Sequence, residues 1–136
     1  IENETNSTVR KIFEEKGEEY FRKLEEKITL KKLKLNSSVI SLGGGAFTNK
    51  NIKSEILKYH LSFWLNWNYK TLIERIKNSR KRPLAFSAKE NELIDLIKKR
   101  SNIYSKALFE IKCDNLSKNE VVEKILNIYD AYQTKN

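Results

Sequence analysis

Three short apolar runs, separated from one another by helical patterns, constrain the fold more than any other feature of the sequence. The runs cover residues 39–42, 61–65 and 109–113. Strands that alternate with helices form βαβ units, in which the strands are parallel and share one sheet. The first two runs are apolar almost throughout, which is typical of strands that helices cover on both faces. The sequence therefore predicts an α/β fold with a parallel sheet sandwiched by helices.

The other segments carry apolar residues at helical spacing. The first predicted helix covers residues 5–16, with Asn6, Ser7 or Thr8 as its N-cap and Gly17 after its end. Further helices are predicted over residues 18–35, 50–58, 69–77 and 90–108, and after Ser117. Residues 78–89 lack an apolar period and contain the only proline, so they are predicted to form a loop. No repeat or linker interrupts the pattern, which indicates one domain over residues 1–136.

Hydrophobic residues make up 39% of the chain, which suffices for one core. The helical patterns place Ile52, Ile56 and Leu57 on one inward face, and Val121, Val122, Ile125 and Leu126 on another. No apolar run approaches the roughly 20 residues that a membrane helix needs. The single cysteine, Cys113, excludes an internal disulfide and a thiol-based zinc cluster, and is predicted to be a buried apolar residue.

The net charge of +9 favours a nucleic-acid-binding protein only at first sight. Six of the 27 basic residues are arginines, whereas base and phosphate recognition favours the bidentate guanidinium group. The lysines are scattered and alternate with glutamates at helical spacing, which is typical of solvated helix faces. In such a background, each arginine is a candidate for a function that lysine cannot serve.

The most distinctive motif is Gly43-Gly44-Gly45, directly after the first apolar run. Open α/β sheets bind ligands at the carboxyl ends of their strands, and glycines let backbone N–H groups approach a ligand closely. A ligand-binding turn is therefore one interpretation of the motif. A plain tight turn is the other.

Three further features involve arginine. Arg22 and Glu25 are three residues apart on one helix face, so the carboxylate could orient the guanidinium group; a surface ion pair is the alternative. Residues 80–84, Arg-Lys-Arg-Pro-Leu, suit a lid that closes on phosphates, or an ordinary basic loop. Arg100 lies on the long helix after this loop, where it is either functional or a surface residue.

Taken in this order, the motifs resemble shikimate kinase from about residue 1 to residue 130. The matching stretches are Ile-Phe-Glu-Glu-x-Gly-Glu-x-x-Phe-Arg-x-x-Glu at 12–25, Val-Ile-x-x-Gly-Gly-Gly-Ala at 39–46, Lys-Arg-Pro-Leu at 81–84, and Arg-x-x-x-Tyr at 100–104. The resemblance implies a P-loop kinase-like sheet with three of its five strands in this chain. It also implies transfer of the γ-phosphoryl group of ATP to the 3-hydroxyl of shikimate, on the route to chorismate and the aromatic amino acids.

On the shikimate side, the resemblance assigns Arg22 and Arg100 to the substrate, and Glu25 to the orientation of Arg22. It places Gly43, Gly44 and Gly45 along the wall of the shikimate pocket, with Gly44 as the surest contact. Two guanidinium groups suit a small carboxylate anion, because each can form a bidentate pair with it.

On the ATP side, Arg82 matches the lid arginine that closes on the phosphates and is the residue with a catalytic role. Residues 78–89 then form the lid. Arg75 matches an arginine near adenine, and Asp114, Asn115 and Leu116 match the adenine-side loop. The implied cofactors are ATP and Mg²⁺, although no metal ligand can be named in this chain.

Two family elements are absent from the sequence: the G-x-x-G-x-G-K-[ST] phosphate-binding motif and an Asp-x-Asp element. The chain also contains no methionine and starts at Ile1. We therefore expect that a strand, P-loop, helix and strand, roughly 40 residues by the size of a βαβ unit, precede Ile1 in the full protein. Residues 1–136 alone are expected to be inactive in an ATP-dependent phosphoryl-transfer assay.

Two other functions remain open at the level of sequence. One is a kinase-like remnant that binds shikimate or a protein partner without catalysis, which the missing motifs favour. The other is a basic nucleic-acid-binding protein, which steep salt dependence of binding would reveal. For the kinase, the resemblance implies a cytoplasmic monomer that binds small molecules and neither membrane nor nucleic acid.

Overall fold

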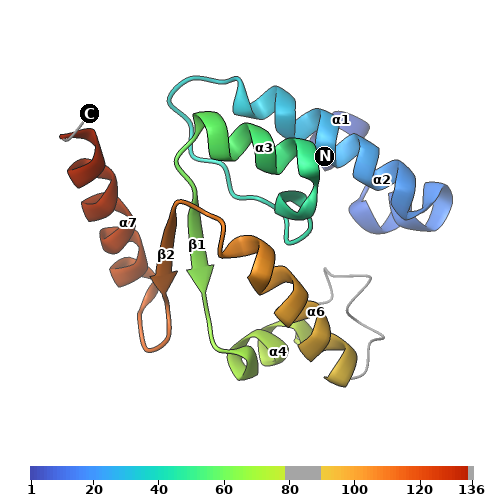
Figure 1. The fold of residues 1–136 in the computed structure, drawn as a ribbon. Helices are drawn as coiled ribbons and strands as arrows, with labels where there is room; N and C mark the ends of the chain where they lie inside the picture. The colour runs from blue at the N-terminus through green and yellow to red at the C-terminus, as the bar shows by residue number, and fades with distance from the viewer. Residues whose placement is uncertain (79–89, 135–136) are drawn as a thin grey trace.

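The computed structural model describes residues 1–78 and 90–134, and its helices and strands follow the predicted alternation (Figure 1). The elements, in chain order, are α1 (Glu2–Thr5), α2 (Val9–Leu33), the 3₁₀ helix η1 (Ala46–Thr48), α3 (Lys50–Tyr59), β1 (Phe63–Asn66), α4 (Tyr69–Lys77), α6 (Glu90–Tyr104), β2 (Phe109–Lys112) and α7 (Lys118–Gln133). The helix predicted over residues 69–77 is confirmed at both ends. The helix predicted over 90–108 ends four residues earlier, and α1 and η1 have no counterpart in the prediction.

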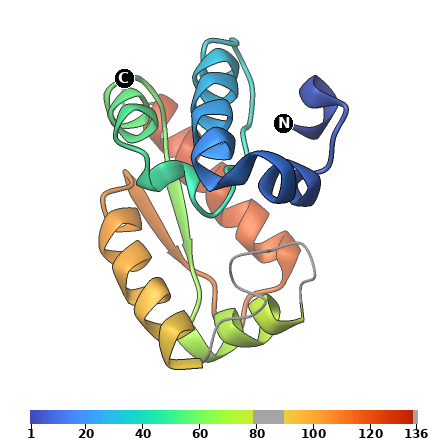
Figure 2. The ribbon, with the colours of Figure 1, turned by 90° about the vertical axis from the view of Figure 1, so that its right-hand side faces the viewer.

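Strands β1 and β2 pair in parallel, as the alternation predicts, with Phe63 opposite Phe109 and Leu65 opposite Ile111. Helix α7 lies on one side of the two strands, while α2, α3 and α6 lie on the other side (Figures 1 and 2). The contacts of α7 with the strands run through Phe63, Ile111 and Val121, which share a core cluster. The two-stranded ladder therefore separates α7 from α2, which carries Arg22, and from α3 and α6.

The strand predicted over residues 39–42 is wrong for the described structure, in which these residues form no ladder. A β-strand is stabilised by hydrogen bonds to a neighbouring strand, and the described part of the chain offers residues 39–42 no such neighbour. Val39 is fully exposed, while Ile40 and Leu42 pack against the core cluster around Phe47. The segment is thus an irregular connection that leads into the glycine turn.

Gly17 interrupts α2, which confirms the predicted end of a helix at this residue. Its dihedral angles, φ 77° and ψ 173°, are not helical and are accessible mainly to glycine. The rings of Phe13 and Phe21 lie 4.6 Å apart on either side of this kink. α2 is therefore two helical segments, and Arg22 and Glu25 both belong to the second.

Polar side chains cap the helices in the expected manner. Thr8 is the N-cap among the three candidates before α2, because its side chain accepts a hydrogen bond from the Lys11 amide. Ser117 and Glu120 form a reciprocal capping box at the start of α7. Asn49 caps α3 and accepts from the amides of Asn51 and Ile52, which fixes the end of the segment that follows the glycine turn.

The described core consists of three clusters rather than one. The first joins α2, η1 and α3 around Phe47 and Ile52, the second joins α4 to α6, and the third joins α7 to the strands. Ile52 and Ile56 are buried as predicted, and Cys113 is fully buried. Leu57, Val122 and Leu126 were predicted to face inward, but they are about half exposed, since no described segment covers their side of the helix.

Acid should weaken the contact between α2 and α3. The side-chain amides of Asn51 and Asn49 donate to the Glu26 carboxylate at 2.6 and 2.7 Å, and these bonds hold the pKa of Glu26 below its ordinary value. A carboxyl group with a lower pKa in the folded chain stabilises the fold above its unfolded pKa, about 4.3, and loses this effect as the pH falls through the folded value. We expect Glu26→Gln to destabilise the chain at pH 7, and the destabilisation to become smaller as the pH falls toward about 3.

Urea unfolding of the parent chain and of the Glu26→Gln variant at both pH values is the measurement. A destabilisation of equal size at pH 7 and pH 3 would contradict the assignment.

No helix in the described residues is long and apolar enough to cross a membrane.

Candidate substrate-binding site

Three segments that are distant in the sequence meet around the glycine turn, Gly43–Gly45. The second part of α2 brings Arg22 and Glu25, and the carboxyl-terminal end of α6 brings Arg100 and Tyr104. Each glycine has a functional group of one of these helices next to it. The structure thus brings together all the residues that sequence analysis assigned to the shikimate side.

Arg22 and Glu25 form the predicted ion pair, with 2.7 Å between Nη1 and Oε2. Glu25 is buried, whereas the side chain of Arg22 is 32% exposed, so the guanidinium group spans the boundary between core and solvent. Its Nη2 also lies 3.1 Å from Oε1 of Glu18. Burial alone would lower the pKa of Arg22, but the bonds and charges of Glu25 and then Glu18 outweigh it and raise this pKa. The interpretation of the pair as a mere surface contact is therefore not supported.

The three glycines differ in what a side chain would meet. A Cβ atom on Gly45 would overlap the Arg22 guanidinium group, at 2.9 Å from Cζ and 3.0 Å from Nη2. On Gly43 it would lie 3.2 Å from Oε1 of Glu25, and on Gly44 3.4 Å from Nη1 of Arg100. Gly45 is thus required for the close approach of Arg22, while Gly44 has room for a methyl group.

The carbonyl groups of the turn are all engaged. The Gly43 carbonyl accepts from the Ala46 amide at 3.0 Å, and the Gly45 carbonyl accepts from the amide and the hydroxyl of Thr48 at 3.1 and 2.6 Å. The Gly44 carbonyl accepts from the Tyr104 hydroxyl. Within residues 1–78 and 90–134, the amides of Gly44 and Gly45 have no hydrogen-bond partner. The turn therefore offers donors and suits a ligand with anionic or hydroxyl oxygens.

Sequence analysis gave Tyr104 no role, although the residue closes the Arg-x-x-x-Tyr motif. Its partner Gly44 is 60 residues away in the sequence, so no local spacing pattern reveals the contact. The position of Tyr104 one helical turn after Arg100 is the signal that could have found it, because residues four apart share a helix face.

The residues assigned to the ATP side gather at a second place, where β1 and β2 end. The Arg75 guanidinium lies over the Trp67 ring, 3.8 Å from its centroid. Asp114 accepts hydrogen bonds from the amide and the side chain of Asn68, at 3.0 and 2.8 Å. Neighbouring Asn115 has a positive φ of 62°, and Leu116 packs into the cluster of Cys113 and Val121. The pair of Arg75 and Trp67 presents a flat cationic surface beside a tight turn.

The thiol of Cys113 lies in the same region. Burial, reinforced by the charge of Asp114, raises the pKa of this thiol above its ordinary value. Cys113 is therefore a packing residue in the protonated form, in agreement with its predicted apolar role.

Arg82 and the rest of the predicted lid from residue 79 to residue 89 lie outside the described residues. No group of three or more His, Cys, Asp or Glu side chains in the described ranges could hold a metal ion. No residue of the described ranges is therefore assigned to Mg²⁺.

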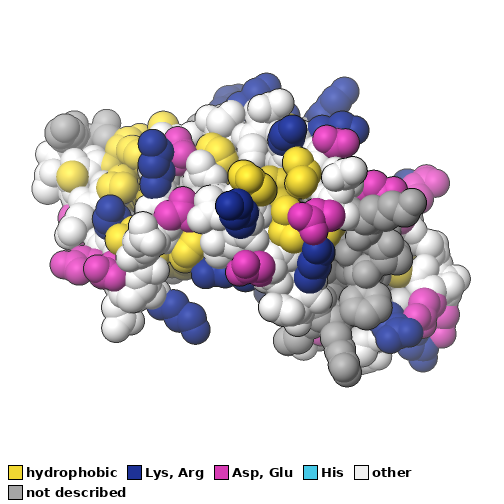
Figure 3. Space-filling view, turned by 90° about the horizontal axis from the view of Figure 1, so that it is seen from below, with side chains coloured by type: hydrophobic (Ala, Val, Ile, Leu, Met, Phe, Trp, Pro, Cys, Tyr) yellow, Lys and Arg dark blue, Asp and Glu magenta, His cyan; other side chains and the backbone are white. Residues whose placement is uncertain are grey.

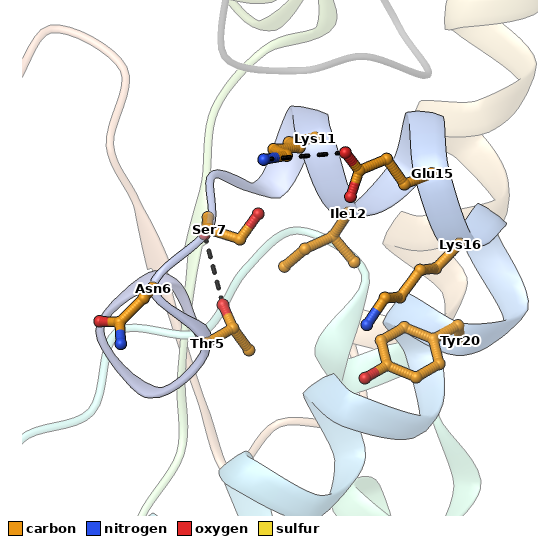
Figure 4. A pocket seen from close by; sticks show the side chains of 8 residues that line it. All are labelled: Thr5, Asn6, Ser7, Lys11, Ile12, Glu15, Lys16 and Tyr20. Carbon is orange, nitrogen blue, oxygen red and sulfur yellow. Dashed lines mark hydrogen bonds and ion pairs between the residues drawn. The ribbon is translucent and has the colours of Figure 1, made fainter.

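Two cavities in the described part of the chain lie away from the glycine turn. One, of about 250 Å³, lies between α1 and the first part of α2, and Tyr20, Lys16 and the Lys11–Glu15 pair line it (Figure 4). A second, of about 320 Å³, lies between β2 and α7. The substrate-side residues are instead arranged around an open turn.

Charge is distributed rather than gathered on the face seen in Figure 3, where basic side chains alternate with acidic ones. Ion pairs among the described residues include Lys23–Glu19 at 2.7 Å and Lys77–Glu90 at 2.6 Å. A continuous basic stripe, which nucleic-acid binding requires, is not seen on this face.

Comparisons with known proteins agree with the geometry. The family model described as shikimate kinase matches residues 1–130. A shikimate kinase of Sulfurihydrogenibium sp. is 34% identical, with 93% of this chain and 75% of that protein covered, and one of Bartonella henselae is 30% identical, with 97% and 63% covered. A solved shikimate kinase of Acinetobacter baumannii in complex with shikimate has a TM-score of 0.88 at 25% identity, with 96% of this chain and 74% of that chain covered.

The chain thus spans 63–75% of the length of these relatives. The structural match confirms the predicted fold class, a P-loop kinase-like α/β fold. With its family match over residues 1–130, its relatives, and the two arginines beside a glycine turn, the chain belongs to the shikimate kinase family.

Proposed function

We propose that this chain supplies the shikimate-binding side of a kinase that transfers the γ-phosphoryl group of ATP to the 3-hydroxyl of shikimate. The reaction is a step toward chorismate and the aromatic amino acids. The observation that carries the proposal is the convergence of Arg22, Glu25 and Arg100 on the glycine turn. The family membership of the chain supports the same reaction.

The substrate carboxylate is the group for which this arrangement is suited. Arg22 is held by Glu25 from the buried side, so its exposed N–H groups are directed without loss of side-chain entropy on binding. Arg100 lies beside Gly44 and adds a second positive charge. Together the two guanidinium groups bind and orient an anion, which is most of what a phosphoryl-transfer enzyme must do for its acceptor.

The amide donors of the glycine turn complement the arginines. Because the carbonyls of Gly43–Gly45 are engaged, the turn presents N–H groups to a substrate oxygen and does not repel it with free carbonyls. A hydroxyl or carboxylate oxygen of shikimate is the proposed acceptor. We assign this binding of a shikimate oxygen to Gly43, Gly44 and Gly45 together.

For the ATP side, we assign Arg75, Asn115 and Leu116 to the adenine, next to Trp67. Arg82 is assigned the catalytic role of neutralising charge on the phosphates, and residues 78–89 the role of the lid. ATP contributes the phosphoryl group. The proposal also includes a monomeric chain in the cytoplasm, which rests on the family resemblance alone.

The first test is direct binding, because binding does not depend on turnover. Titration of the chain with shikimate, followed by NMR chemical shifts, should give saturable shifts at Arg22, Gly44 and Arg100. The methyl ester of shikimate, which lacks the carboxylate charge, should bind about a hundredfold more weakly. Equal affinity for the acid and the ester would contradict the proposal.

An arginine-to-lysine pair provides the matched control. Arg100→Lys keeps the charge but loses the bidentate geometry, so the affinity for shikimate should fall about tenfold. Arg10→Lys makes the same change on an exposed turn of α2 and should leave the affinity as it is. An equal effect of both substitutions would show that general positive charge, and not a site, attracts the ligand.

A further inference from the structure

We propose that Tyr104 is a positioning residue, whose hydroxyl pins the Gly44–Gly45 peptide so that the glycine turn keeps its amide donors toward shikimate. The inference rests on the proposed function for the identity of the ligand. Its structural part, the pinning of the peptide, can be tested without a ligand.

The peptide between Gly44 and Gly45 is held differently from its neighbours. The Gly43 and Gly45 carbonyls bond within the same short segment, to Ala46 and to Thr48. The Gly44 carbonyl bonds to the Tyr104 hydroxyl, which α6 brings from 60 residues away. In a trans peptide the C=O and N–H groups point in opposite directions, so a hydrogen bond to the Gly44 carbonyl also sets the direction of the Gly45 amide.

This peptide needs an external hold because Gly45 cannot carry a side chain. A Cβ atom there would overlap the Arg22 guanidinium group, so glycine is required for packing. Glycine, however, also permits positive φ, and a rotation of the peptide plane by half a turn would take Gly45 from its φ of −108° into that region. The rotated peptide would present the Gly44 carbonyl where the amide donor was, and a carbonyl repels a carboxylate.

The ring of Tyr104 is itself well fixed. It packs edge-on against the buried Phe47 ring, with 6.2 Å between centroids, and lies against the first core cluster. Removing the hydroxyl therefore leaves the ring in place, and Tyr104→Phe removes the hydrogen bond to Gly44. Because the rigid Tyr104 side chain holds the turn in place before the ligand binds, little conformational entropy of the turn is lost on binding.

The test uses the Tyr104→Phe variant of the full chain, with Tyr129→Phe as the matched control on the exposed face of α7. Shikimate titrations should show about tenfold weaker binding by Tyr104→Phe and parent-like binding by Tyr129→Phe. The thermal unfolding midpoints of the two variants should agree. NMR coupling constants that report φ of Gly45 should move, in Tyr104→Phe without ligand, toward an average that includes positive values.

The outcomes separate the inference from the proposed function. If Tyr104→Phe binds shikimate within twofold of the parent, or φ of Gly45 does not change, the inference is overturned. If the parent chain binds no shikimate, the proposed function fails, and the φ value of Gly45 still decides whether Tyr104 pins the turn. Weaker binding together with a changed φ supports both.

Discussion

Alanine at position 45 should weaken shikimate binding about a hundredfold and should also destabilise the fold, because it separates Arg22 from Glu25. The added Cβ atom would overlap the end of the Arg22 side chain, which is flexible enough to move aside. The guanidinium group then leaves both Glu25 and the place of the substrate carboxylate. The effect should therefore appear both in affinity, measured by shikimate titration, and in the thermal unfolding midpoint, which should fall toward that of Arg22→Met.

The neighbouring glycines are the controls for this prediction. Gly44→Ala puts its methyl group 3.4 Å from Arg100, an ordinary van der Waals distance, and should weaken binding much less. Gly43→Ala falls between the two, because its methyl group lies 3.2 Å from the Glu25 carboxylate. Equal losses of affinity at all three positions would show that backbone flexibility, and not the contact with Arg22, makes glycine necessary.

Arg22→Met should lower the free energy of unfolding by about 2 kcal/mol. The substitution leaves the Glu25 carboxylate buried without its partner, and loss of one partner of a fully buried pair typically costs 3–5 kcal/mol. The lower figure of about 2 kcal/mol takes into account that the Arg22 side chain is a third exposed, so water screens the pair. Urea unfolding at pH 7 measures the change.

Two further variants show whether burial is the cause. Arg10→Met breaks a pair with Glu14 that has the same 2.7 Å distance but is exposed on both sides, so its stability should stay at the parent value. Arg22→Met combined with Glu25→Leu removes both charges and should recover much of the lost stability. If the double variant is less stable than Arg22→Met, the buried carboxylate is not the source of the cost.

The parts of the fold and site that local spacing determines could be predicted from the sequence. The Arg22–Glu25 pair follows from helix geometry, and the caps at Thr8 and Ser117 follow from side chains that accept from nearby amides. The strand expected over residues 39–42 could not be judged in this way, because an apolar run becomes a strand only when another strand pairs with it. Local composition does not contain that information.

The contacts between distant segments had to come from the structure. The Tyr104 hydroxyl reaches Gly44 only because α6 and the turn before η1 pack together. The stacking of Arg75 on Trp67 joins the last turn of α4 to the residue directly after β1, and no periodic pattern marks this contact. Leu126 is half exposed although its spacing predicts an inward position. An apolar period identifies the apolar face of a helix, but it does not show whether another segment covers that face.

Helix α6 contributes residues to two of the three core clusters, so it connects them mechanically. Leu93 near its start is packed against Ile73 and Ile76 of α4, while Ile103 and Tyr104 at its end pack near the glycine turn. Its 15 residues contain neither glycine nor proline and span about 22 Å as one stiff rod. A displacement of α4 should therefore tilt α6 as a rigid body and move Arg100 and Tyr104 with it. One stiff helix thus connects α4, which carries Arg75 of the ATP side, to the residues of the shikimate side.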